Sequence, residues 1–137
     1  MAKAVRRSRK PAAKPAIPRL PKELKLAIAA AADRKAEDVT LLDLRKASAF
    51  TDFFLICTGT NIRQVQAIAD AVQSAAREAG AKPSLVEGYE RGQWILLDYF
   101  DFIVHVFTAG TRDFYGLERL WGDAKQIKIS EGTSSRT

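Results

Sequence analysis

The side chains that most often carry out chemistry are few in this sequence and lie far apart. Cys57 is the only cysteine and His105 the only histidine, and they lie in the apolar runs FFLIC and IVHVF. A zinc site needs about four Cys, His or carboxylate ligands close together. We therefore expect no metal site, a buried unreactive thiol, and a partly buried histidine with a hydrogen-bond partner. A lone cysteine also excludes an internal disulfide and indicates a reducing compartment.

The stretch CTGTN, residues 57–61, joins an apolar run to a helical pattern, and backbone N–H groups at such a joint can hold an anion. It has a single glycine and matches no glycine-rich phosphate motif, so a polar helix cap is the favoured interpretation. Nucleotidyl transfer would also require paired carboxylates to hold metal ions, and Asp43 and Asp52 each stand alone. We therefore predict that the protein is not an enzyme and needs no cofactor.

Apolar periodicity predicts the elements that position these residues. Apolar side chains at spacings of three and four predict a helix over 62–79, with Thr60 or Asn61 as its cap and Gly80 after its end. The continuous apolar run at 53–57 is typical of a central strand. The remaining expected elements are helices at 24–32 and 113–121 and strands at 39–44, 84–87, 94–98 and 102–107. Their order predicts one α/β (α+β) domain, with a mixed sheet of about five strands and helices packed on it.

Charge is distributed unevenly along the chain. The net charge is +6, from 22 cations and 16 acids. Residues 1–22 contain eight of those cations and no acid, which leaves 14 cations against 16 acids in residues 23–137. Four prolines also lie in this first segment and oppose the amphipathic helix of a transit peptide, so we predict a disordered basic arm. Such an arm either remains solvated without a binding partner or contacts RNA phosphates.

The same composition sets the expected domain boundaries. We predict the arm at 1–22, a folded domain at 23–124 and a weakly ordered tail at 125–137. No apolar run is long enough to cross a bilayer, so no membrane association is expected, and the location is expected to be cytoplasmic.

The segment VEGYERGQWILLDYFDFIVHVF, residues 86–107, reads as two strands joined by a tight turn. Alternation along a strand places Trp94, Leu96 and Asp98 on one face and Ile95, Leu97 and Tyr99 on the other. An aromatic anchor beside acids is typical of a protein interface. Two interpretations of Trp94 stay open: an interface anchor, or a core residue packed under the long helix.

Three stretches of the sequence, between about Asp38 and Ala124, resemble the ribosomal silencing factor or Iojap family. They are LLDLRKASAFTDFFLICTGTNIRQVQAIADAV, VEGYERGQWILLDYFDFIVHVF and RDFYGLERLWGDA, in this order and spacing. The resemblance implies a nucleotidyltransferase-like core without catalytic residues. It also implies a protein that binds the large ribosomal subunit at its ribosomal protein fourteen, blocks joining of the small subunit, and lowers translation when nutrients are short. Free members of the family can form dimers.

Carried over position by position, the resemblance implies a partner-binding surface in the hairpin. Its residues would be Trp94, Asp98, Tyr99 and Asp101, bordered by Glu90 and Arg91. The family usually has glycine where this chain has Phe100, which puts the geometry of the turn in question. The arm lies outside the resemblance, and a ribosome-biogenesis or RNA-binding role through it is the alternative function.

Overall fold

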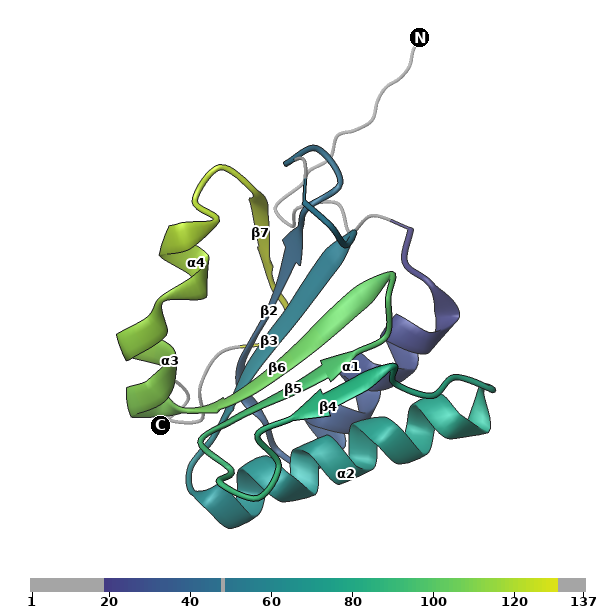
Figure 1. Cartoon of the computed structure of the whole chain (residues 1–137), viewed down its shortest axis with the longest axis vertical. Helices are drawn as coiled ribbons and strands as arrows, with labels where there is room; N and C mark the ends of the chain where they lie inside the picture. Colours follow the sequence, from purple (N-terminus) through teal and green to yellow (C-terminus); the bar gives the residue numbers. More distant parts are fainter. Residues whose placement is uncertain (1–18, 48, 131–137) are drawn as a thin grey trace, which may run out of the picture.

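A computed structural model describes residues 19–47 and 49–130 as a single mixed α/β domain (Figure 1). One sheet has the strand order β4-β5-β6-β3-β2-β7, and helices lie on both of its faces (Figure 1). The strands are β2 (Glu37–Asp43), β3 (Phe53–Gly59), β4 (Leu85–Glu87), β5 (Trp94–Asp98), β6 (Phe102–Thr108) and β7 (Lys125–Lys128). The predicted fold class is confirmed, and the sheet has six strands rather than about five.

β3 lies inside the sheet, as its continuous apolar run predicted. Every one of its seven residues is buried, and it pairs in parallel with β6 and antiparallel with β2. A parallel pair requires a crossover between its strands, and the chain from α2 (Ile62–Glu78) through β4 and β5 provides it. The parallel pairing of β3 with β6 is what makes the sheet mixed among the described strands.

Helices α1 (Lys22–Asp33) and α2 cover one face of the sheet (Figure 1). Most of the predicted apolar stripe of α2 is buried there, whereas Ala75 and Ala79 are half-buried and Ile62 at its start is exposed. Asn61 caps this helix, as expected, by accepting a hydrogen bond from the backbone N–H of Gln64 at 2.8 Å. The helix ends beside Gly80, whose φ of +89° is the left-handed conformation that glycine favours after a helix.

The other face is partly covered by α3 (Ala109–Tyr115) and α4 (Leu117–Leu120). A single helix over 113–121 was predicted, and this prediction is wrong: Gly116, with φ of +56°, divides the segment. The break changes which side chains are buried. Leu117 packs on the sheet, whereas Phe114 and Leu120, expected on the same apolar stripe, are exposed.

Two predicted boundaries need correction. The predicted weakly ordered tail includes β7, which pairs antiparallel with β2 and buries Ile127. The predicted disordered arm ended at residue 22, yet Leu20 is buried in the core and α1 begins at Lys22. Residues 1–18 and 131–137, which hold the rest of those predictions, lie outside the described residues.

Candidate functional site

Trp94, Leu96 and Asp98 lie on the same face of β5, as the strand alternation predicted, and all three are half-buried. This is the face that α3 and α4 cover only in part. Trp94 and Leu96 pack against the apolar cluster on that side, and Tyr115 at the end of α3 is half exposed beside them. We call Trp94, Leu96, Asp98 and Tyr115 the Trp94 surface.

The indole of Trp94 is held in one orientation. Its Nε1–H donates a hydrogen bond to Nδ1 of His105 at 3.0 Å. Its ring stacks on Phe107, with centroids 5.0 Å apart, and contacts the Tyr115 ring at 4.7 Å. Because α2 lies on the opposite face of the sheet, Trp94 is not the core residue under the long helix that one interpretation expected. It is a rigid aromatic side chain at the border between core and solvent, which suits an interface anchor.

His105 is buried and hydrogen-bonded to Trp94. It is 3% exposed, and burial lowers its pKa to about 3, so the imidazole is neutral at physiological pH. Nδ1 accepts the indole hydrogen bond, so the proton of the ring resides on Nε2, which has no partner among the described residues. The predicted buried, hydrogen-bonded histidine is confirmed.

Tyr99 does not belong to this surface. It lies on the opposite face, buried in the cluster under α1 and α2, with its ring stacked on Phe102 at 5.0 Å. Burial raises the pKa of its hydroxyl. Tyr99 is therefore left out of the Trp94 surface, because the strand alternation that places Asp98 on that surface turns the next residue inward.

The other predicted site residues divide between the two ends of β5. Glu90 and Arg91 are exposed in the loop that enters β5, near Trp94. Asp98 and Asp101 lie at the opposite end, about 13 Å away for a strand of this length. Asp101 is exposed, whereas one oxygen of Asp98 accepts the backbone N–H of Phe100 at 2.8 Å. The hairpin therefore presents Trp94 beside Glu90 and Arg91 at one end of β5, and two carboxylates at the other end.

Gly88 shapes the loop at the Trp94 end. Its φ is +79°, and a Cβ added there would lie 2.1 Å from the carbonyl oxygen of Trp94. Only glycine permits the loop to pass this close to the start of β5. The backbone at Gly88 thus helps to fix where Trp94 begins its strand.

A buried arginine holds α3 on the sheet. The Arg112 guanidinium donates to the backbone carbonyl of Asp38 at 2.7 Å and to the Thr58 hydroxyl at 2.8 Å. It also donates to Thr40 and forms a salt bridge with Glu118. These contacts join α3 and α4 to β2 and β3, and so keep Tyr115 against Trp94.

The joint at residues 57–61 is closed to anions by its own side chains. The side-chain oxygen Oε1 of Gln64 accepts hydrogen bonds from both the backbone N–H and the hydroxyl of Thr60, at 2.6 and 2.7 Å. The expectation of a polar helix cap is confirmed. Burial raises the pKa of the Cys57 thiol to about 12, so the thiol is unreactive, as predicted.

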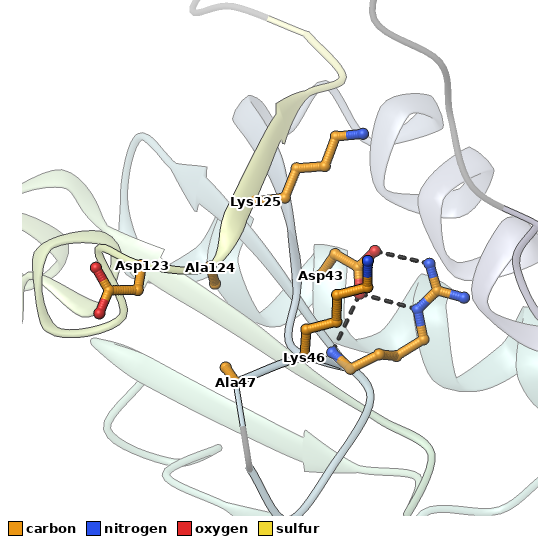
Figure 2. A pocket seen from close by; sticks show the side chains of 7 residues that line it. Asp43, Lys46, Ala47, Asp123, Ala124 and Lys125 are labelled. Atoms are coloured by element: carbon orange, nitrogen blue, oxygen red, sulfur yellow. Dashed lines mark hydrogen bonds and ion pairs between the residues drawn. The ribbon is translucent and has the colours of Figure 1, made fainter.

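A cavity of about 380 Å³ opens between the loop after β2 and the segment that enters β7. Figure 2 shows Asp43, Lys46 and Lys125 among the side chains that line it. Both Asp43 oxygens accept from Arg45, at 2.9 and 2.7 Å, and the side-chain hydrogen bonds lower the pKa of Asp43. This carboxylate is already occupied. Within residues 19–47 and 49–130 there is no group of three or more residues able to hold a metal ion.

Sequence reasoning missed two features of the site. Tyr115 was not singled out, although its position beside Gly116, a helix-ending glycine, could have indicated that it points away from a continued helix. The hydrogen bond between Trp94 and His105 was also missed, because it joins diagonal neighbours and depends on the register of β5 with β6.

No helix in the described part of the chain is long and apolar enough to span a membrane.

The chain is similar to known proteins in both sequence and fold. Residues 17–137 match the family model "Ribosomal silencing factor during starvation". The chain is 46% identical over 112 residues to a Ribosomal silencing factor RsfS from Halalkalibacterium halodurans, covering 82% of this chain and 95% of that protein. It is also 46% identical over 109 residues to the Bacillus subtilis protein of the same name, covering 80% and 92%. The fold is also similar to the crystal structure of a Chromobacterium violaceum protein that is 36% identical in sequence. The match covers 85% of this chain and 97% of that protein, with a TM-score of 0.72.

The fold is a mixed α/β domain shared with the Chromobacterium violaceum protein. The chain belongs to the ribosomal silencing factor family, which also matches plant proteins named Iojap. The resemblance identified from the sequence is confirmed.

Proposed function

We propose that this protein binds the large ribosomal subunit, chiefly its ribosomal protein fourteen, and blocks joining of the small subunit by occupying the shared face. Translation initiation would then fall when nutrients are limiting. The observation that supports the proposal best is the fixed, half-exposed indole of Trp94, in a chain of the ribosomal silencing factor family. An aromatic side chain held in its bound orientation loses little conformational freedom on binding.

The surroundings of Trp94 suit a basic partner. Glu90 supplies negative charge near Trp94, with Arg91 beside it, and Asp98 and Asp101 supply negative charge at the far end of β5. Ribosomal proteins are basic, so these acids provide complementarity that speeds association and fixes the register of docking. Exposed Phe114 and half-exposed Tyr115 on α3 extend the apolar area. We propose Trp94, Asp98, Asp101, Glu90 and Arg91 as the partner-binding residues.

The proposed mechanism is steric exclusion in the cytoplasm, without a chemical step. It is supported by the occupied Asp43 carboxylate, the buried neutral His105 and the self-capped joint at Thr60, each of which has another role in the fold. Metal-dependent turnover of nucleotides by the purified protein would contradict a purely steric mechanism.

A subunit-joining assay tests the proposal directly. Purified small and large subunits are mixed with and without the protein, and the amount of joined ribosome is measured by sucrose-gradient sedimentation. We expect joining to decrease in proportion to the protein bound to large subunits. Binding to large subunits with no decrease in joining would contradict the exclusion mechanism, and absence of binding would contradict the proposed partner.

We also propose that the free protein forms a homodimer. The exposed aromatic residues of α3 offer area that a second copy can cover in the absence of the ribosome. Sedimentation equilibrium over a range of concentrations would show a monomer–dimer equilibrium, and addition of large subunits would dissociate the dimer if both partners use the same surface.

A further inference from the structure

Two phenylalanines, Phe50 and Phe100, extend into solvent from neighbouring loops at one end of the sheet. They are 75% and 79% exposed. The two loops are bonded to each other: the Thr51 hydroxyl donates to the carbonyl of Phe100 at 2.8 Å, and the backbone N–H of Asp52 donates to the carbonyl of Asp101 at 3.1 Å. We call Phe50 and Phe100, with Asp52 and Asp101, the Phe50–Phe100 tip.

The backbone of Phe100 is in a conformation that its side chain disfavours. Its φ is +77°, in the left-handed region where a Cβ crowds the neighbouring carbonyl. Hydrogen bonds hold it there: its N–H donates to the Asp98 carboxylate, its carbonyl accepts from Thr51, and Tyr99 and Phe102 close the turn. Glycine would satisfy this backbone without strain, and the Phe100 ring fills no core.

A strained residue with an exposed apolar side chain needs an explanation outside the folding of the monomer. Strain of this kind concentrates where a side chain is presented to a partner. Phe50 adds a second large apolar side chain from the adjoining loop, and its exposure likewise contributes nothing to the core. The tip therefore has the apolar anchors of an interface, at the end of the hairpin that carries Asp98.

The charges around the tip favour a basic occupant. Asp52 and Asp101 are exposed, and neither forms a salt bridge with a described residue. Arg45 forms its salt bridge with Asp43 and interacts with Asp52 only through longer-range attraction. Lys46 lines the cavity of Figure 2. Lysine and arginine side chains combine an apolar stem and a cationic head, which fit an aromatic ring beside a carboxylate.

We propose that the Phe50–Phe100 tip is a second anchor that docks on a basic protein segment of the large ribosomal subunit. This inference rests on the proposed function and adds the chemistry of one contact. A protein segment is favoured over RNA because the carboxylates of Asp52 and Asp101 repel phosphates. The turn at Phe100 fixes the backbone from which the ring extends, so little backbone freedom is lost on docking.

Two substitutions test the tip separately from the Trp94 surface. Phe100→Gly removes the ring and relieves the backbone, so the variant should unfold at the same or a higher urea concentration than wild type. Phe50→Ser removes the neighbouring ring. We expect the double variant to bind large subunits about thirtyfold more weakly in a cosedimentation titration, which is the lower limit for the loss of a hot-spot contact. Ile62→Ser, which removes an exposed apolar side chain at the start of α2, is the matched control and should bind normally.

The outcomes distinguish the inference from the proposed function. If wild type binds large subunits and the folded double variant binds equally well, the tip is not an anchor and the proposed function stands. If the double variant loses affinity for naked ribosomal RNA but not for purified ribosomal protein fourteen, the occupant is RNA and the inference is wrong. Loss of self-association alone would show that the occupant is a second copy, which also overturns it. If wild type fails to bind large subunits, the proposed function is wrong and the inference with it.

Discussion

The indole N–H of Trp94 donates to Nδ1 of His105 across the β5–β6 ladder, at 3.0 Å. The two residues are diagonal neighbours, since Trp94 pairs directly with Phe107 and His105 with Leu96. This one bond joins the candidate binding surface to the buried cluster around Phe54, whose ring contacts the imidazole edge-on at 4.5 Å. The orientation of the exposed aromatic is therefore determined by the core.

Truncation of the indole should weaken binding to the large subunit. We expect Trp94→Ala to reduce the binding free energy by about 2 kcal/mol, the loss expected for a central aromatic anchor. Trp94→Phe retains much of the ring stacking and should lose less. Cosedimentation with large subunits measures both, and urea unfolding verifies that each variant is folded. Glu78→Ala, on the exposed end of α2 behind the sheet, serves as a control. Normal binding by folded Trp94→Ala would exclude this docking surface.

The stability of the fold should depend on pH through His105. Its pKa is about 3 in the folded protein and about 6.5 when unfolded, so the unfolded chain takes up the proton first as the pH falls. The stabilising contribution is complete above pH 6.5 and decreases as the pH approaches 3. Between pH 8 and pH 5 we expect a loss of about 2 kcal/mol in the free energy of unfolding.

Urea unfolding at these two pH values, in wild type and His105→Leu, measures this contribution. The variant should be less stable at pH 8, because the Trp94 N–H loses its acceptor, yet should change much less between the two pH values. Trp94→Phe retains His105 and should keep the wild-type pH dependence. Equal pH dependence in wild type and His105→Leu would show that another group is responsible.

Arg112 should contribute far more to stability than the other arginine that forms a salt bridge in the described chain. Arg112→Ala leaves the Glu118 carboxylate and the Thr58 hydroxyl without their shared donor in a largely buried site. We expect a loss of about 3–5 kcal/mol in the free energy of unfolding, typical of breaking a buried ion pair. Arg45→Ala removes a pair with Asp43 in which the arginine side chain is 45% exposed, and should have a much smaller effect. Urea titration of the two variants provides the comparison, and similar losses would contradict the structural role of Arg112.

The basic arm should modulate binding without carrying it. Residues 1–18 contain six lysines and arginines and lie outside the described residues. Their deletion should leave binding to large subunits largely intact, while reducing its dependence on salt concentration if the arm contacts phosphates. Titrations at several salt concentrations measure this slope. Loss of binding on deletion, together with normal binding by Trp94→Ala, would instead support the alternative RNA-binding function.

The sequence predicted best those elements whose pattern is long and local. The start of α2 was predicted correctly and its end to within one residue, because five turns of apolar spacing and two caps agree. β7 was missed for the opposite reason. It has four residues, of which only Ile127 is buried, and its strand conformation depends on the distant partner β2. Gly116 shows a third case, since a glycine inside an amphipathic pattern either stays helical or ends the helix.

The candidate site was predicted only in part. Alternation placed Trp94 and Asp98 together, and the same alternation placed Tyr99 on the other face, but the resemblance to a family carried Tyr99 into the predicted surface. The contact of Tyr115 with Trp94 joins separate elements and becomes visible only when the strand register and the break at Gly116 are known. Single residues can be placed on a face from sequence, whereas their partners require the tertiary structure.

The outermost strands of the sheet are shorter than the central ones. β2, β3 and β6 have seven residues each, while the outermost strands β4 and β7 have three and four. An outermost strand leaves one row of peptide groups without a partner, and a long row would recruit other chains into open-ended stacking. At ~10 Å, β4 offers too short a row for such growth. The chain can thus expose aromatic side chains such as Phe100 and Tyr115 while its short outermost strands resist aggregation.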